Sequence, residues 1–510
     1  MSISNFASLV PAARSGSPLI LKSGRGIESR YTRGAILLIL AATAFHFAYS
    51  THLELVGDEA YYWLWSRHLD ICYLDKGPMI AWLIGGGTAL FGQTVFGVRF
   101  FAVLLAAGTG AGLYLLGKEL FSQRVGFWAV VLATLAPLFV VGATLMTIDT
   151  VYVFFWTWAA WAFWRAKDST DLRFWLLTGA LVGCGLLSKY TAAIELVSFA
   201  TFCCWHPPSR AHFRRGTFWS MMGAALLFLA PAIVWNSRHH WPTSDWLLQR
   251  GALNQRFFLH PANALAFLGE QAGVLSPLFL LGLFYLLCRP SLLRIARAPT
   301  AYTVALFLPL FALYFTLSFH YLGPPNWTAA AYIGGLILLA AKWAELAGLY
   351  PWARRATIAG IVLAALETTV LLETRWLHLP PKIDLLDRAR GSRSLAASVL
   401  EAERRTGAQF VISDNYMTAA LLSFYLPGQP ETFVPITTRP LNQIELWPTY
   451  DQKHPADNAL IVTKGRRPAS SVYKSFTRLT SLGSVDITDQ GRKVGSYQFY
   501  LGERDRRGAR

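Results

Sequence analysis

Apolar and polar residues occur in long separate blocks over most of this chain. Apolar stretches of membrane-spanning length recur from residue 34 to about residue 375, with short polar segments between them. A helix needs about 20 apolar residues to cross a bilayer, so the pattern predicts an all-α polytopic membrane protein. About eleven spans are expected, near residues 34–53, 98–117, 125–146, 150–165, 174–188, 190–205, 217–235, 270–289, 300–319, 327–343 and 356–374.

One apolar stretch, residues 78–91, is too short to be an ordinary span. It reads PMIAWLIGGGTALF, and a run of about 14 residues is more often interfacial or buried than spanning. If it lies along the membrane surface, most basic loop residues fall on the same side as the basic N-terminal tail. The positive-inside rule favours that arrangement. We therefore expect interfacial helices in the first outer loop.

This topology places several loops together on one outer face. They cover residues 54–98, the surroundings of Asp149, residues 236–261 and the short segment 320–326. An odd number of spans puts the C-terminus on that face too. The expected location is therefore a multi-pass protein with a cytoplasmic N-terminus and an extracytoplasmic C-terminus.

Both ends of the chain differ from the apolar middle. Residues 1–33 are rich in Ser, Gly and Arg and are predicted to be a disordered cytoplasmic tail. The membrane domain is expected over residues 34–375. Residues 376–510 are predicted to form a small α/β or α+β domain. Its expected elements are a helix at 395–405, strands at 408–413, 458–465, 484–488 and 496–501, and a turn at 489–491.

Composition agrees with the membrane assignment. Charged residues are 15% of the chain and hydrophobic residues 54%, whereas a soluble protein carries about 25% charged residues. The net charge of +17 does not indicate nucleic acid as a partner, because the basic residues lie between apolar runs, as cytoplasmic loop charges do. The five cysteines show no zinc spacing and no paired framework, so we expect them to pack as small apolar groups.

The first outer loop reads GDEAYYWLWSRHLDICYLDKGP and holds most of the candidate functional residues. Its AYYWLW segment is amphipathic and aromatic, which suits the headgroup level of a membrane. Each candidate also has a structural alternative, such as a helix cap, a local ion pair or a membrane anchor. The candidates are Asp58, Glu59, Tyr61, Tyr62, Asp75 and Lys76.

Three further candidates lie in later loops. Asp149, in TLMTIDTVYVFFW, stands where the third span meets the fourth, and acidic groups at membrane depth are costly and tend to be functional. It could also cap the fourth span. Lys189 lies between two short spans and could snorkel to the interface. Arg256 lies in the third outer loop, where a surface turn is the alternative.

In their order along the chain, these motifs resemble the GT-C superfamily of polyprenyl-phosphate-sugar glycosyltransferases (families 39 and 83). The motifs are GDEAYYWLW, YLDKGP, TLMTIDT, GLLSKYTA and PPNWTAAAY, with ALLSFYLPGQP and RPLNQIELW in the tail. Within the superfamily the chain is similar to bacterial relatives of the protein O-mannosyltransferases, including the lipid A aminoarabinose transferase and the rhizobial lipid A and core galacturonosyltransferases. The family often has Lys-Pro-Pro where this chain has Lys76-Gly77-Pro78.

The resemblance implies a function. It implies transfer of a sugar from a polyprenyl-phosphate donor to a cell-envelope acceptor (lipid A, lipopolysaccharide core, another glycan or a protein) at the periplasmic face of the bacterial inner membrane, with inversion. It implies that Asp58 lies near the acceptor and that Lys76 faces the donor phosphate. Lys189 and Arg256 are further candidates for that phosphate. The alternatives are a transporter or flippase of a lipid-linked sugar and a non-catalytic assembly partner.

A divalent metal ion is a candidate cofactor, because in the aminoarabinose branch the acidic residue before the lysine helps to bind a metal. The corresponding ligands here would be Asp75 and Asp149. The third ligand is open among His239, His240 and His320, with His320 as the choice.

Overall fold

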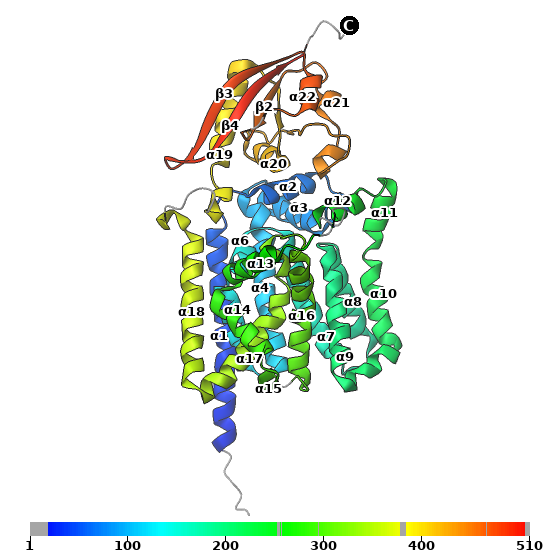
Figure 1. The fold of residues 1–510 in the computed structure, drawn as a ribbon, viewed down its shortest axis with the longest axis vertical. Helices are drawn as coiled ribbons and strands as arrows, with labels where there is room; N and C mark the ends of the chain where they lie inside the picture. The colour runs from blue at the N-terminus through cyan, green and yellow to red at the C-terminus, as the bar shows by residue number, and fades with distance from the viewer. Residues whose placement is uncertain are drawn as a thin grey trace, which may run out of the picture.

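The computed structural model describes residues 19–251, 256, 258–293, 295–377, 384–465 and 467–504. Figure 1 shows three tiers along the long axis of the molecule. A bundle of long helices forms the first tier, a thin layer of short helices the second, and a domain containing a β-sheet the third. The candidate loop residues lie mainly in the thin middle layer.

The bundle contains most of the helices that were predicted from the apolar runs. They are α1 (Leu19–Tyr49), α4 (Val95–Leu120), α5 (Gln123–Leu135), α6 (Pro137–Thr144), α7 (Ile148–Ala166), α8 (Leu172–Leu186), α9 (Ala193–Trp205), α10 (Gly216–Leu227), α11 (Ala230–Arg238), α13 (Pro261–Leu275), α14 (Pro277–Leu287), α15 (Pro290–Leu293), α16 (Ala298–Ser318), α17 (Ala331–Leu349) and α18 (Pro351–Leu372). Helix α1 already covers residues 19–33, where disorder was predicted, because its Leu, Lys and Arg residues extend the apolar helix that follows. Residues 1–18 of that tail lie outside the described residues.

The chain is a multi-pass membrane protein. Within the described residues, six helices are long and apolar enough to span a bilayer, and the number rises to eight if two bent helix pairs each count as one span. Helix α3 (Met79–Phe91), helix α8 and the segment Tyr190–Trp205 are shorter apolar helices. The expected total of about eleven spans therefore stays a prediction.

Two predicted continuous helices are broken. The predicted span 125–146 bends by 75° between α5 and α6, and the predicted span 270–289 by 117° between α13 and α14. Each break is followed by a proline, Pro137 or Pro277, and Ser276 has a φ of 90°. Proline lacks the amide hydrogen that continues a helix and disfavours helical backbone at the residue before it, which explains both breaks.

The middle layer consists of α2 (Gly57–Arg67), α3 and α12 (Pro242–Arg250), which lie between the bundle and the sheet domain in Figure 1. Helices α2 and α3 both come from the first outer loop, and they pack against each other. The short apolar stretch at residues 78–91 thus forms a helix beneath the sheet domain.

The C-terminal domain holds one four-stranded sheet with the order β1-β2-β4-β3. Its strands are β1 (Phe410–Ser413), β2 (Ala459–Thr463), β3 (Arg478–Asp489) and β4 (Arg492–Glu503). Strands β1 and β2 are parallel, and the other pairs are antiparallel. Gln490 and Gly491 both have positive φ at the β3–β4 turn, as a two-residue hairpin requires. Each of the four predicted strands overlaps an observed one, and α19 (Ser392–Thr406) covers the predicted helix.

Candidate functional site

A buried ion pair fixes the start of the first outer loop. Glu59 of α2 and Arg99 of α4 are both fully buried. Arg99 donates two hydrogen bonds to the Glu59 carboxylate, from Nε to Oε1 at 2.8 Å and from Nη2 to Oε2 at 2.6 Å. Arg99 also donates to the backbone carbonyls of Ser50, Leu53 and Glu54. All five guanidinium donors are therefore used, as a buried arginine requires.

Glu59 also contacts the second outer loop. Its Oε1 accepts a hydrogen bond of 2.9 Å from the amide of Met146, three residues before Asp149, and its Oε2 accepts one of 3.1 Å from Val56. Glu59 was a candidate for the acceptor loop with a structural role as the alternative, and these contacts engage its carboxylate in the structural role. Its place in the structure is to hold the segments that carry Asp58 and Asp149 in register.

The C-terminal domain packs against the first outer loop through α20 (Tyr416–Tyr425). The rings of Trp63 and Phe424 meet edge to face with centroids 4.9 Å apart, and Tyr61 and Tyr416 lie 4.6 Å apart. The hydroxyl of Tyr61 accepts a 2.6 Å hydrogen bond from the amide of Gln443. These contacts bury Tyr61 and make the C-terminal domain part of the site.

Tyr61 and Tyr62 also lie close to the acidic residues. Tyr61 is within electrostatic range of Asp75, and Tyr62 is within electrostatic range of Asp58 and Asp75. Burial raises the pKa of both phenols well above the ordinary value. They therefore stay protonated and act as hydrogen-bond donors or packing groups.

A close backbone contact positions Lys76. A Cβ built on Gly77 would lie 2.0 Å from the carbonyl oxygen of Leu187, and the amide of Met79 donates to that same oxygen at 3.1 Å. Leu187 lies two residues before Lys189. The absence of a side chain at Gly77 thus lets the Lys76 segment and the Lys189 segment touch.

Replacing Gly77 by alanine is expected to separate these two segments. Because the clash is with backbone, the expected cost is about 1–3 kcal/mol of stability. Displacement of Lys76 should lower the sugar transfer that the motif resemblance implies by about 10- to 100-fold. Thermal unfolding and transfer assays on the purified protein would measure both. Gly86→Ala in α3 is the matched control, because its Cβ would meet only the Phe101 ring at 3.4 Å. Equal behaviour of the two variants would contradict the role given to Gly77.

Asp149 is held by two partners at the start of α7. Its Oδ1 accepts from Lys189 Nζ at 2.7 Å, and its Oδ2 accepts from Asn326 Nδ2 at 2.5 Å. Lys189 and Asp149 are both buried. A carboxylate in the first turn of a helix is also stabilised by the helix dipole. Three outer loops thus meet at Asp149.

The charged candidates form one electrostatic cluster. Lys76 interacts with Asp75, Asp149 and Lys189, and Asp58 interacts with Lys76 and Asp149. Arg250 of α12, which the sequence did not single out, acts on Asp58, Lys76 and Lys189. The expected Arg256 is instead exposed.

Protein surroundings shift the proton affinities of this cluster. Burial raises the pKa of Asp75 to about 6, and burial lowers the pKa of Lys76 to about 8. Asp58 is exposed to the cavity, but the surrounding protein still partly desolvates its carboxylate and raises its pKa, with the charges of Lys76 and Arg250 opposing that shift. Lys76 Nζ lies 4.0 Å from the centroid of the Trp246 ring, which stabilises its charged form.

A cavity of about 950 Å³ lies between the bundle and the C-terminal domain. Asp58 opens into it from α2. Apolar residues of α6 and α18 form one wall, and Arg388 and Lys464 bring positive charge to the domain side. The charge of Arg388 also acts on Asp58. The cavity is therefore amphipathic, and an acidic group stands at its edge.

The described residues do not fit the expected metal centre. They contain no group of three or more His, Cys, Asp or Glu side chains that could hold a metal ion. Both oxygens of Asp149 already accept hydrogen bonds, and His320 lies half-buried in the turn after α16. Asp75 Oδ1 is buried and has no hydrogen-bond partner, but one carboxylate oxygen does not make a divalent-cation site.

Sequence reasoning missed Arg250, Trp246 and Asn326. Arg250 and Trp246 lie in a polar surface segment whose pattern resembles any amphipathic helix. Asn326 lies in the PPNWTAAAY motif, which gave the only local signal for it. Their importance arises from contacts with residues far away in the sequence, such as the pair of Asn326 and Asp149.

Comparison with known proteins extends this description. Residues 75–235 match the family model described as dolichyl-phosphate-mannose-protein mannosyltransferase. The chain is 24% identical over 420 residues to the lipid A galacturonosyltransferase RgtD of Rhizobium johnstonii, covering 77% of this chain and 83% of that protein. It is 26% identical over 272 residues to an undecaprenyl phosphate-alpha-4-amino-4-deoxy-L-arabinose arabinosyl transferase of Pseudomonas savastanoi, covering 49% of this chain and 48% of that one.

Solved structures show the same architecture. ArnT from Cupriavidus metallidurans bound to undecaprenyl phosphate superposes with a TM-score of 0.61 at 15% identity, covering 91% of this chain and 97% of that one. ArnT from the same organism in the apo state gives a TM-score of 0.58 at 14% identity, covering 92% of this chain and 98% of that one. The resemblance expected from the motifs is thus confirmed, and the chain has the fold of the GT-C superfamily of glycosyltransferases.

Proposed function

We propose that this protein is a membrane glycosyltransferase that transfers a sugar from a polyprenyl-phosphate donor to a cell-envelope acceptor. The observation that carries the proposal is the convergence of Asp58, Asp75, Lys76, Asp149 and Lys189 from separate loops beneath the C-terminal domain. The relatives named as acting on lipid A or on an undecaprenyl-phosphate sugar support this reading. Lipid A is accordingly the acceptor class that we favour.

The reaction is a single displacement at the anomeric carbon of the donor. An acceptor oxygen forms a bond to C1 while the bond from C1 to the donor phosphate oxygen breaks, and the electron pair leaves with the phosphate. Attack opposite the leaving group inverts the anomeric centre. The donor becomes a polyprenyl phosphomonoester, which gains negative charge as the bond breaks.

Cations of the cluster are placed to stabilise that charge. Lys76 and Arg250 interact electrostatically with each other and with the acids, and neither is neutralised by a direct ion pair of its own in the described structure. Lys189 forms an ion pair with Asp149, and this pair holds together the two loops that carry these residues. Preorganised cations that meet a developing anion are among the strongest catalytic devices available to an enzyme.

Asp58 lies on the cavity side of the cluster and is suited to the acceptor. Its raised pKa makes its carboxylate a better proton acceptor than an ordinary aspartate. If the acceptor is a hydroxyl group, Asp58 takes its proton as the new bond forms. If the acceptor is a phosphate, that oxygen is already ionised and Asp58 orients it.

The proposed orientation places the site on the outer side of the bacterial inner membrane. The positive-inside rule supports it, since Lys118 and Arg165 lie in the last turns of α4 and α7, the helices that begin at the first and second outer loops. In a cysteine-free background, Ser484→Cys in β3 is expected to react with an impermeant maleimide on intact cells. Lys118→Cys is expected to react only after lysis. The reverse labelling pattern would contradict the orientation.

Two measurements test the function directly. Purified protein in lipid nanodiscs is expected to move a radiolabelled sugar from polyprenyl phosphate to lipid A. Mass spectrometry of lipid A, glycans and glycoproteins from cells lacking the protein is expected to show loss of one sugar. Transport of the lipid-linked sugar across vesicle membranes without transfer would indicate a flippase instead.

The pH dependence of transfer is expected to be bell-shaped. Lys76 carries its charge below its pKa of about 8, so transfer should fall as pH rises through that value. Asp58 must be ionised to accept a proton, and its pKa is raised above the ordinary aspartate value, so transfer should also fall at acidic pH. Lys76→Arg should remove the alkaline fall, because arginine stays protonated. An unchanged alkaline limb in that variant would exclude Lys76 as its source.

A further inference from the structure

The loop that carries Lys76 connects α2 to α3 without forming a helix or strand anywhere in its described residues, 68–78. We call it the Lys76 loop. Its second half is largely buried, and the amide of Tyr73 donates to the carbonyl of Lys76 at 3.1 Å, which closes one turn. The other buried amides of the loop need partners elsewhere, because an unpaired buried amide is costly. These partners decide where Lys76 lies.

One of these partners comes from the C-terminal domain. The amide of Leu74 donates to Oε1 of Gln443 at 2.8 Å, and both residues are buried. The backbone amide of Gln443 donates to the hydroxyl of Tyr61 at 2.6 Å. Gln443 thus contacts helix α2 and the Lys76 loop at once, although it lies 369 positions after Leu74 in the sequence.

The segment that bears this glutamine is held by contacts of its own. It forms the 3₁₀ helix η6 (Gln443–Leu446), within the RPLNQIELW motif of the sequence. Asn442 caps this helix by accepting a hydrogen bond from the amide of Ile444 at 3.1 Å. At the other end of η6, Leu446 packs against the buried apolar cluster that contains Leu74. The position of the acceptor carbonyl is therefore fixed by the C-terminal domain.

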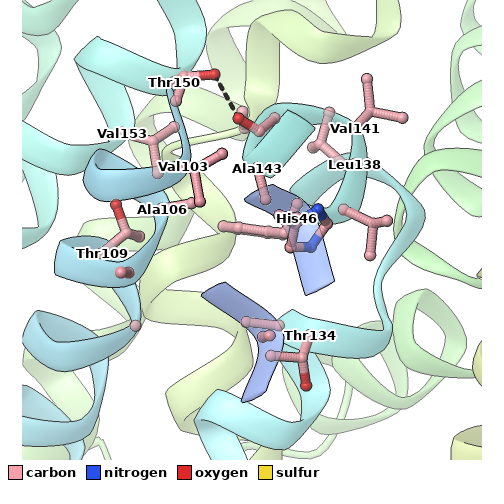
Figure 2. A pocket seen from close by; sticks show the side chains of 18 of the residues that line it. His46, Val103, Ala106, Thr109, Thr134, Leu138, Val141, Ala143, Thr150 and Val153 are labelled. Carbon is pink, nitrogen blue, oxygen red and sulfur yellow. Dashed lines mark hydrogen bonds between the residues drawn. The ribbon is translucent and has the colours of Figure 1, made fainter. Parts of the chain in front are cut away.

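The loop that carries Asp149 is held differently, by helices of the bundle. The hydroxyl of Thr150 donates to a backbone carbonyl of α6 at 2.8 Å, as the dashed line in Figure 2 shows. His46 Nδ1 of α1 lies 3.0 Å from Thr144 Oγ1 at the end of α6. These bonds join α1, α6 and α7 to one another. The loop of Asp149 is thus tied to the bundle, whereas the loop of Lys76 is also tied to the C-terminal domain.

From these contacts we infer that Gln443 is a positioning residue, through which the C-terminal domain holds Lys76 in place for the donor phosphate. The inference rests on the proposed function and adds to it a role for the C-terminal domain on the donor side of the reaction. Loss of the Gln443 carbonyl leaves the amide of Leu74 buried without an acceptor, so the loop should shift until that amide reaches water. Lys76 follows two residues later and moves with it. A displacement of about 1 Å at a group that faces the leaving phosphate lowers the rate about a hundredfold.

Hydrogen exchange tests the contact without a transfer assay. Wild-type protein and Gln443→Met, both in nanodiscs, are compared by mass spectrometry of peptides that cover residues 68–78. Methionine keeps the length of the side chain and lacks the acceptor carbonyl. Exchange in the peptide that contains Leu74 is expected to become faster by about tenfold or more. Gln409→Met is the matched control and should leave this peptide unchanged, because the exposed Gln409 accepts from another backbone amide of the same domain, that of Asn458, at 2.7 Å.

A double-mutant cycle tests the role in transfer. Gln443→Met alone is expected to lower kcat for sugar transfer about 10- to 100-fold, because Lys76 is misplaced. Added to Lys76→Ala, the same change should lower transfer by less than about threefold, since its effect passes through the missing lysine. A contribution that is only structural would multiply the two losses.

A second variant, Gln443→Asn, guards against misfolding of the first. It keeps the amide but is one methylene shorter, so its carbonyl no longer reaches Leu74, and it should behave as Gln443→Met does. The inference is overturned if exchange in residues 68–78 is unchanged in both variants, if it rises equally across the whole protein, or if the loss of transfer persists in full beside Lys76→Ala. Faster exchange in the variants of a wild-type protein that transfers no sugar overturns only the proposed function.

Discussion

Replacing Asp58 by asparagine is expected to lower sugar transfer about 10²–10⁴-fold, the range that one positioned proton acceptor supplies. Replacing Lys76 by alanine is expected to lower it about 10²–10³-fold, because one charge facing the leaving phosphate is lost. Both effects should appear in kcat under saturating donor, since both groups act on charge that develops during the reaction. A radiolabel transfer assay in nanodiscs measures them.

The controls for these two variants are charged residues outside the cluster. Asp70→Asn alters the same outer loop, where Asp70 accepts from Trp235 Nε1 at 2.9 Å and is exposed. Lys118→Ala removes an exposed lysine at the end of α4. Both controls should transfer at close to the wild-type rate. Normal transfer by Asp58→Asn and Lys76→Ala, with folding intact, would refute the assignment of the site.

Removing one partner of the buried pair between Glu59 and Arg99 is expected to cause the largest loss of stability. Arg99→Met leaves a buried carboxylate without its cation, and a loss of this kind costs about 3–5 kcal/mol. Since Glu59 also binds the amide of Met146, the loop that carries Asp149 should loosen as well. Thermal unfolding of the purified protein, followed by intrinsic fluorescence, measures the loss.

An exposed pair provides the comparison. Arg165 Nη1 lies 3.4 Å from Glu119, and the Arg165 side chain is half exposed, so Arg165→Met should change stability by less than about 1 kcal/mol. A double variant with Glu59→Leu and Arg99→Met should be more stable than Arg99→Met alone, because no unpaired charge remains. If the double variant is the less stable one, the penalty arises from lost packing and the electrostatic argument fails.

Local pattern by itself determined much of this molecule. The apolar blocks predicted the helices of the bundle, and alternating segments predicted all four strands of the C-terminal sheet. The order of motifs predicted that Asp58, Asp75, Lys76 and Asp149 act together. The helices and strands could be predicted because their periodicity depends on neighbours within a few positions, whereas the grouping of the four residues was implied by the resemblance of the ordered motifs.

Only the tertiary structure decided which polar side chains face the site. Glu59 and Asp58 are adjacent in sequence, yet one is consumed by Arg99 and the other opens into a cavity. Arg250 belongs to the charge cluster, whereas Arg256 is exposed. The need for glycine at position 77 depends on Leu187, more than a hundred residues away. Contacts of this kind are set by how whole helices pack, so no periodicity along the chain records them.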